Sequence, residues 1–166
     1  MVLGREAKIL VKVLFICLGN ICRSPTGEGV FETLIKSEGL DDRISVDSAG
    51  TAAYHVGEPP DPRSQAAALR RGIDMSSQKA RRVRADDFVE FDYLVAMDQD
   101  NRSNLLAICP PGLEHKIHLM LNFAEGMEEQ SVPDPYFTGG NGFEVVLDLI
   151  ENASQGLLGD IRNKHF

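Results

Sequence analysis

The segment CLGNICRSP, Cys17 to Pro25, combines the residue types that can bind an anion and attack it. A strongly apolar run leads into the segment and a helical pattern follows it, which indicates a turn between a buried strand and a helix. Backbone N–H groups in such a turn, together with the positive end of the helix dipole, form a ready anion site. A cysteine at its centre faces the bound anion, and nearby cations and helix N-termini favour its thiolate form. The segment therefore predicts attack of sulfur on phosphorus.

The residues after the cysteine suit a phosphate-binding loop. Gly19 allows the backbone to approach a phosphate closely, and Asn20 is one of the few residue types that tolerate a left-handed backbone. Arg23 has the planar fork that binds two phosphate oxygens at once, which a lysine could not reproduce. Ser24 can donate its hydroxyl to the sulfur. The predicted phosphate-binding residues are Leu18, Gly19, Asn20, Ile21, Cys22, Arg23 and Ser24.

Sulfur attack on a phosphate ester needs a proton donor for the leaving oxygen. Asp134 is the candidate, because the segment VPDPYF, Val132 to Phe137, holds a single carboxylate between two prolines that stiffen the backbone. An Asp-Pro pair is also common in plain turns, and for this segment alone that alternative stays open. The phosphate loop contains no acid of its own, so Asp134 is the leading general-acid candidate.

The loop needs a strand before it and a helix after it. We expect the strand over Lys8–Ile16, and a helix with Ser24 as its N-cap, Pro25 at its first position and Gly39 after its end. The pattern predicts further strands over Ile44–Asp47, Tyr93–Met97 and Ile117–Met120. It predicts further helices over Pro62–Leu69 with Asp61 as the cap, over Asp98–Ile108, and near the C-terminus with Phe143, Val146, Leu147, Ile150 and Leu157 on one face.

Strands that alternate with helices indicate a three-layer α/β fold, in which a parallel sheet has helices on both faces. Ligands of such sheets bind at the carboxyl ends of the strands, which is where Cys17 lies. The length of 166 residues suits one domain, residues 1–166, that needs no disulfides to be stable.

Composition limits the partners and the location of the protein. The net charge of −8 argues against a nucleic-acid or acidic-membrane partner, and no run of about 20 apolar residues can span a membrane. The basic run Lys79–Arg84 is interpreted as a solvated face beside the acidic segment that follows it, rather than as a docking patch. Three cysteines cannot all pair, and a chain of this size does not need disulfides, so we expect a reducing cytoplasmic location.

The chain resembles the low-molecular-weight protein tyrosine phosphatases. The likeness rests on six segments in matching order and spacing: CLGNICRSP (17–25), DSAG (47–50), YHVGEPPDPRS (54–64), KAR (79–81), AMD (96–98) and PDPY (133–136). It implies a four-stranded parallel sheet with flanking helices. It also implies Cys17 as the nucleophile that forms a phosphocysteine, Arg23 as the phosphate clamp and Asp134 as the general acid and base, with neither a metal nor a cofactor.

The same resemblance implies roles for residues around the loop. Asn20 would hold a left-handed turn with support from Ser24 and Ser48. Tyr54 and Tyr136 would form the walls of the substrate cleft and stack on an aromatic leaving group, which favours phosphotyrosine over the shorter phosphoserine. Ordinary half-exposed packing is the alternative for these tyrosines. The implied partners are phosphotyrosine-containing proteins, and the implied state is a monomer or a weak dimer.

Cys22 has two interpretations. It lies five residues from Cys17 on the same tight loop, so an oxidised Cys17 could condense with it to a disulfide and escape irreversible oxidation. The alternative is a small apolar residue that fills space in the core.

Two other functions fit the same fold less well. Arsenate reductases relay electrons through further cysteines after the second helix, and this chain has none between Cys22 and Cys109. A non-catalytic anion or redox sensor would keep the loop but would not need Asp134. Relatives that act on phosphoarginine carry a smaller polar residue at the loop position of Ile21. The sequence therefore favours phosphotyrosine hydrolysis.

Overall fold

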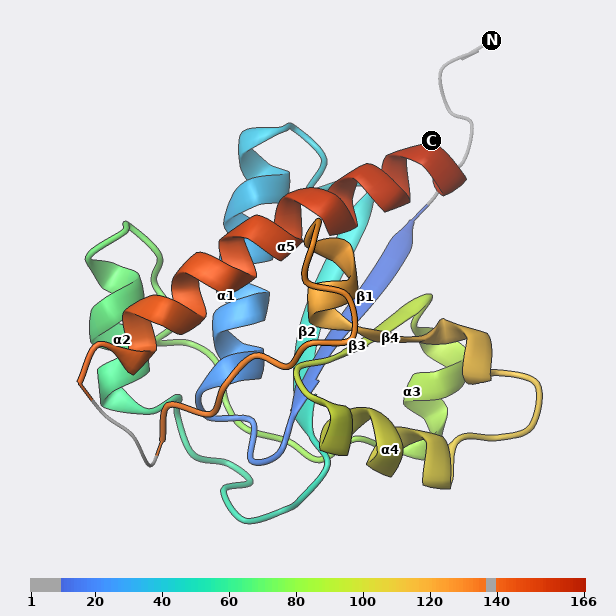
Figure 1. Cartoon of the computed structure of the whole chain (residues 1–166), viewed down its shortest axis with the longest axis horizontal. Coiled ribbons are helices and arrows are strands. Elements are labelled where there is room, and N and C mark those ends of the chain that lie inside the picture. Colours follow the sequence, from blue (N-terminus) through green and yellow to red (C-terminus); the bar gives the residue numbers. More distant parts are fainter. Residues whose placement is uncertain (1–9, 137–139) are drawn as a thin grey trace, which may run out of the picture.

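Four parallel strands in the order β2-β1-β3-β4 form the central sheet of the computed structural model, which describes residues 10–136 and 140–166 (Figure 1). The strands are β1 (Val11–Cys17), β2 (Ile44–Gly50), β3 (Tyr93–Ala96) and β4 (Ile117–Leu119). Cys17 pairs with Gly50 in the register of the two neighbouring strands, so the carboxyl ends of β1 and β2 lie side by side. The predicted parallel sheet is confirmed.

Helices cover both faces of the sheet. One face carries α1 (Arg23–Ser37), α2 (Pro62–Leu69) and α5 (Gly142–His165), and the other carries α3 (Ala85–Glu90) and α4 (Gln99–Ile108) (Figure 1). Two short 3₁₀ turns, η1 (Glu114–Lys116) and η2 (Met120–Phe123), flank β4. This arrangement confirms the three-layer α/β fold. Within the part of the chain that the structure describes, no helix is both long and apolar enough to cross a membrane.

The central strand β1 explains the apolar run that precedes the loop. Val13 and Phe15 pack in the core that α1 and α5 cover, whereas Leu14 and Ile16 pack in the core that α3 and α4 cover. All four side chains are fully buried. A strand that is buried on both faces needs an unbroken apolar sequence, and this strand delivers Cys17 to the edge of the sheet.

The first helix begins two residues earlier than predicted. Its N-cap is Cys22 instead of Ser24, and α1 starts at Arg23. The Ser24 hydroxyl therefore does not cap the helix, and it lies 3.0 Å from the sulfur of Cys17. This correction has a chemical consequence, because it places the side chain of Ser24 in the phosphate loop.

Other boundaries shift by a few residues. Lys8 and Ile9 of the first predicted strand lie outside the described residues, and β2 continues past Asp47 to Gly50 because it pairs with the whole of β1. Helix α3 was not predicted, since six residues are too few for a clear helical pattern. The cap predicted at Asp61 is confirmed, and its carboxylate accepts a hydrogen bond of 2.8 Å from the backbone N–H of Arg63.

Candidate active site

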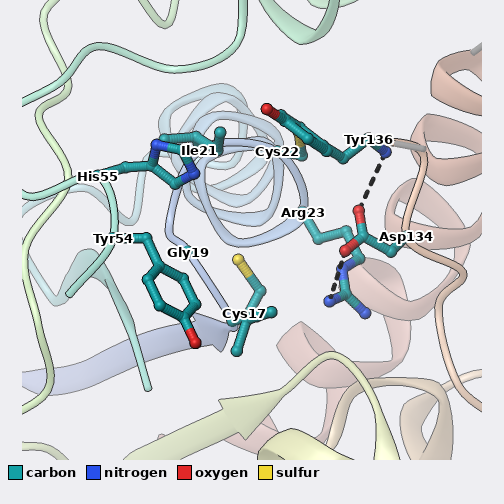
Figure 2. A pocket seen from close by; sticks show the side chains of 10 residues that line it. Cys17, Gly19, Ile21, Cys22, Arg23, Tyr54, His55, Asp134 and Tyr136 are labelled. Carbon is teal, nitrogen blue, oxygen red and sulfur yellow. Dashed lines mark hydrogen bonds and ion pairs between the residues drawn. The ribbon is translucent and has the colours of Figure 1, made fainter. Parts of the chain in front are cut away.

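The loop between β1 and α1 forms the floor of a cavity of about 140 Å³. Cys17 stands at its centre with 3% of its surface exposed, and Figure 2 shows its sulfur pointing into the space between the surrounding side chains. The cavity brings together residues from the first strand and its loop, the loop after β2 and the segment before α5. These residues are Cys17, Leu18, Gly19, Ile21, Cys22, Arg23, Tyr54, His55, Asp134 and Tyr136.

Asn20 holds the loop in its tight conformation from behind. Its backbone is left-handed, with φ of 59°, as expected from the sequence. Its side-chain amide donates hydrogen bonds to the hydroxyl of Ser24 at 2.8 Å and to that of Ser48 at 3.0 Å. Its side-chain oxygen accepts the backbone N–H of Arg81 at 3.0 Å. Asn20 therefore ties the loop to β2 and to the segment that precedes α3.

The network around Asn20 also orients the hydroxyl that faces the sulfur. Because the Ser24 oxygen accepts the Asn20 amide, its own proton is free for a second bond. The sulfur of Cys17 lies 3.0 Å from this hydroxyl, while the other available acceptor, the carbonyl of Ala49, lies 3.4 Å away. A hydroxyl that donates to sulfur stabilises a thiolate more than a thiol.

Glu28 ends this network on the side away from the cavity. Its carboxylate accepts a hydrogen bond of 2.7 Å from the hydroxyl of Ser48. Burial raises the pKa of Glu28 to about 7, and the neighbouring Asp47 and Glu32 add to the shift. The charge of this partly buried carboxyl therefore changes near neutral pH.

Arg23 is buried behind the cavity and is held by three groups. Its guanidinium donates to a carboxylate oxygen of Asp98 at 2.6 Å and to the carbonyl oxygen of Val132 at 3.0 Å, and it lies 3.6 Å from a carboxylate oxygen of Asp134. Burial alone would lower the pKa of Arg23, but the sulfur of Cys17 and the two carboxylates raise it above its ordinary value. The guanidinium is therefore a fixed positive charge beside the sulfur.

Asp98 is a functional residue that sequence reasoning did not assign. It appeared there only within the AMD segment and as the start of a predicted helix. In the structure it is the N-cap of α4, where one carboxylate oxygen accepts the N–H of Asn101 at 2.7 Å and the other holds Arg23. The signal that could have found it is its position directly after a strand that ends beside β1.

Asp134 reaches the cavity from the segment before α5. One carboxylate oxygen accepts the backbone N–H of Tyr136 at 3.0 Å, which turns the side chain inward, and the other lies near Arg23 (Figure 2). The side chain is one-third exposed, so water and a ligand can both reach it. The structure thus brings Cys17, Arg23 and Asp134 to one cavity, as the sequence analysis expected.

Aromatic side chains form the mouth of the cavity. Tyr54 and Tyr136 both line it and are 75% and 39% exposed, which leaves their rings accessible. His55 lies between them and was not predicted as a site residue, although its neighbour Tyr54 was. The imidazole contacts a carboxylate oxygen of Glu58 at 2.5 Å, and its ring centre lies 6.2 Å from that of Tyr136.

Gly19 is needed for a contact that the sequence analysis did not foresee. A Cβ atom at this position would lie 2.9 Å from a ring carbon of His55. The missing side chain therefore lets the imidazole pack against the loop, in addition to any role in phosphate approach.

Cys22 also lines the cavity and is almost fully buried. Burial raises the pKa of its thiol to about 12, with smaller contributions from Asp61 and Cys17. Both Cys17 and Cys22 are free cysteines in this structure. Cys22 is therefore a thiol that faces the same cavity as the predicted nucleophile.

Part of the basic run 79–84 is structural. Arg81 forms ion pairs of 3.0 Å with Asp47 and with Asp87, a carboxylate with no exposed surface. The expected solvated face is thus wrong for Arg81, because its guanidinium compensates a buried charge. Arg82 and Arg84 are exposed, in agreement with the expectation.

Within residues 10–136 and 140–166, no group of three or more His, Cys, Asp or Glu side chains is arranged to hold a metal ion.

Comparisons with known proteins agree with this geometry. A family profile described as low molecular weight phosphotyrosine protein phosphatase matches residues 12–165. The chain is 39% identical over 157 residues to the low molecular weight protein-tyrosine-phosphatase YfkJ of Bacillus subtilis, with 93% of this chain and 98% of the relative covered. The crystal structure of YfkJ matches with a TM-score of 0.90 and 38% identity, over 98% of this chain and 100% of that one. The crystal structure of DARP, a Drosophila arginine phosphatase, matches with a TM-score of 0.85 and 33% identity, over 93% of this chain and 99% of that one.

Proposed function

Because the chain belongs to the low molecular weight phosphotyrosine protein phosphatases, a class of hydrolases, we propose that it hydrolyses phosphotyrosine in proteins through a phosphocysteine intermediate. One observation carries the proposal. The sulfur of Cys17, the guanidinium of Arg23 and the carboxyl group of Asp134 line the same small cavity. They are a nucleophile, an anion clamp and a proton donor, which are the three groups that this reaction needs.

In the first step the Cys17 thiolate attacks phosphorus and forms a sulfur–phosphorus bond. The bond from phosphorus to the tyrosine oxygen breaks, and protonated Asp134 gives its proton to the departing phenolate. Arg23 and the loop N–H groups bind the equatorial oxygens, where negative charge accumulates. The Ser24 hydroxyl, 3.0 Å from the sulfur, stabilises the thiolate before the attack.

In the second step water attacks the phosphorus of phosphocysteine. Asp134, now ionised, takes a proton from the water, and the sulfur leaves as a thiolate. The products are inorganic phosphate and the enzyme in its starting form. The partial exposure of Asp134 supports this role, since water can reach the carboxylate once the phenol has left.

The walls of the cavity support an aromatic substrate. Tyr54 and Tyr136 present accessible rings at the mouth, and Ile21 adds apolar surface on the loop side. A phosphotyrosine ring would be sandwiched by these side chains while its phosphate reaches the loop. Phosphoserine is too short to contact the rings and the loop at once.

Phosphate release from three peptides tests this function. The peptides carry phosphotyrosine, phosphoserine or phosphoarginine, and Cys17→Ser is the control. We expect release from the phosphotyrosine peptide, abolished by the substitution. Release from phosphoarginine would keep the mechanism but overturn the substrate, a result that the likeness to an arginine phosphatase makes worth measuring. Phosphate binding without any release would point to an anion sensor.

We further propose that the protein acts in the cytoplasm on phosphoproteins, as a monomer or weak dimer, with no nucleic-acid or membrane partner. The free Cys17 and Cys22 support a reducing environment, because the nucleophile must stay reduced. The net charge of −8 supports the exclusion of nucleic acid.

A further inference from the structure

The segment that carries Asp134 is anchored on both sides of this residue. Residues 131–134 belong to no helix or strand, so contacts with other elements decide where the carboxyl group lies. On one side, the carbonyl of Val132 accepts the guanidinium of Arg23 at 3.0 Å. On the other side, the carbonyl of Tyr136 accepts a hydrogen bond of 3.2 Å from the guanidinium of Arg63. Asp134 therefore lies midway between two arginine contacts.

Asp61 fixes Arg63 and ties it to the phosphate loop. The two carboxylate oxygens of Asp61 accept the guanidinium at 3.1 and 2.9 Å, a paired geometry that a lysine cannot reproduce. The hydrogen bond from Arg63 holds the pKa of Asp61 below its ordinary value. The backbone N–H of Asp61 in turn donates to the carbonyl of Ile21, in the phosphate loop, at 2.8 Å. Arg63 therefore bridges the phosphate loop and the segment that carries Asp134.

The contact with Tyr136 bears directly on the predicted general acid. The backbone N–H of Tyr136 donates to a carboxylate oxygen of Asp134 at 3.0 Å, and Figure 2 shows this bond beside the cavity. Arg63 holds the carbonyl of the same tyrosine, so it restricts the backbone from which that N–H projects. Its guanidinium carbon also lies 5.5 Å from the ring centre of Tyr136 and 4.8 Å from that of Phe143, within cation–π range. One side chain thus fixes both the backbone and the ring of Tyr136.

We propose that Arg63 is a positioning residue for the general acid: it does not line the cavity, but it keeps the Asp134 carboxyl group aimed at the leaving oxygen. The inference rests on the proposed function and adds a residue to its machinery. Without the guanidinium, Asp134 can still take up and release a proton, but the Tyr136 end of its segment is no longer tied to the phosphate loop. The acid is then less well aligned, and the first step slows whenever the leaving group needs a proton.

Two aryl phosphates of similar size test this role. The leaving group of p-nitrophenyl phosphate needs no proton, whereas that of phenyl phosphate does, and kcat/KM for each reports the first step alone. In Arg63→Met we expect kcat/KM to fall by about threefold to tenfold for phenyl phosphate and by less than about twofold for p-nitrophenyl phosphate. The ratio of the two constants should therefore rise. An unchanged ratio would overturn the proposal, because a merely structural role would lower both constants by the same factor.

A double variant shows whether Arg63 acts through the acid. Asp134→Ala should raise the ratio by more than Arg63→Met does, and Arg63→Met added to it should raise the ratio no further. A further rise of the same size would contradict the proposal, because Arg63 would then act independently of Asp134. Arg70→Met is the matched control, since Arg70 is also an exposed arginine of the α2 region and pairs with Glu144 in the first turn of α5 at 3.2 Å. It should leave the ratio unchanged.

The failure of this role differs from the failure of the proposed function. If the wild-type protein hydrolyses neither aryl phosphate, the function fails, and a crystal structure of Arg63→Met tests the positioning role instead. An Asp134 carboxylate that has turned out of the cavity, beyond its 3.6 Å distance from Arg23, would support the role, and an unmoved carboxylate would refute it. Thermal unfolding checks that Arg63→Met is folded. If it is not, Arg63→Lys gives the same comparison, because an ammonium group lacks the planar fork.

Discussion

The ion pair between Asp98 and Arg23 can be removed selectively by mutation. Asp98 uses one carboxylate oxygen to cap α4 through the N–H of Asn101 and the other to hold the guanidinium at 2.6 Å. Asp98→Asn keeps a good N-cap, since Asn and Asp cap equally well, but it removes the charge that fixes Arg23. Asp98→Ala removes both functions. The two variants therefore separate phosphate clamping from helix capping.

The structure sets the expected size of the effect. A hydrogen bond to a charged group contributes about 1.5–3 kcal/mol, and each 1.36 kcal/mol corresponds to about tenfold in rate. Arg23 keeps its bond to the Val132 carbonyl and its proximity to Asp134, so it stays in place but loses its exact aim. We expect kcat to fall by about tenfold to a hundredfold in both variants. Only Asp98→Ala should also lose about 1 kcal/mol of stability from the missing cap.

The assay uses p-nitrophenyl phosphate, together with thermal unfolding of each variant. Asp61→Asn is the matched control, because Asp61 is also an N-cap whose carboxylate pairs with an arginine, Arg63, which does not line the phosphate cavity. It should change kcat by less than about threefold. If Asp98→Asn keeps wild-type kcat, or if Asp61→Asn loses as much, the clamping role assigned to Asp98 is wrong.

Three further predictions concern stability and redox chemistry. Burial raises the pKa of Glu28 from 4.5 to about 7. Between pH 4.5 and pH 7, therefore, Glu28 is still protonated in the folded protein but has lost its proton in the unfolded chain. The free energy of unfolding should therefore fall as pH rises from about 4.5 to 7, by on the order of 3 kcal/mol, and Glu28→Gln should flatten this part of a denaturant-based stability profile. Gly156→Ala should destabilise the protein by about 3 kcal/mol or more in thermal unfolding, because the new Cβ would lie 1.8 Å from a carbonyl oxygen of η2. Gly159→Ala, which has open space around it, should be neutral or stabilising. Similar melting temperatures for the two variants would contradict this. Peroxide should oxidise Cys17, which then forms a disulfide with Cys22, and a thiol reductant should cleave this disulfide and restore activity. In Cys22→Ser the reductant should fail to restore activity. Equal recovery in both proteins would leave Cys22 as a packing residue.

Local signals were sufficient to predict the phosphate loop. Three features sufficed, and each spans only a few residues: an unbroken apolar run, a Gly-Asn pair and a Ser-Pro pair. Each indicates the backbone conformation at its own position, namely a buried strand, a tight turn and a helix start. The fold followed from the same kind of information, because the alternation of strands and helices restricts the topology. The helix start was misplaced at Ser24 because N-cap preferences consider only bonds from the serine hydroxyl to the backbone of its own helix. In the structure this hydroxyl contacts the sulfur of Cys17 instead.

Contacts between distant segments were beyond this kind of reasoning. Arg23 and Asp98 are 75 residues apart, and Asn20 and Arg81 are 61 apart, so no spacing in the sequence could pair them. Arg81 looked like one more residue of a basic run because the carboxylates that surround it come from β2 and α3. The residues around His55 form no motif that marks it as a site residue, and only the folded loop shows that it packs against Gly19.

The covalent intermediate can be observed by mass spectrometry of Asp134→Ala incubated with p-nitrophenyl phosphate. This leaving group needs no proton, so Cys17 can still be phosphorylated, while the missing carboxylate slows the hydrolysis that follows. We predict that the rapidly quenched protein gains the mass of one phosphoryl group and that the group maps to the peptide with Cys17. The double variant Asp134→Ala, Cys17→Ser should not gain this mass. Continued release of p-nitrophenol with Cys17 unmodified would contradict the mechanism.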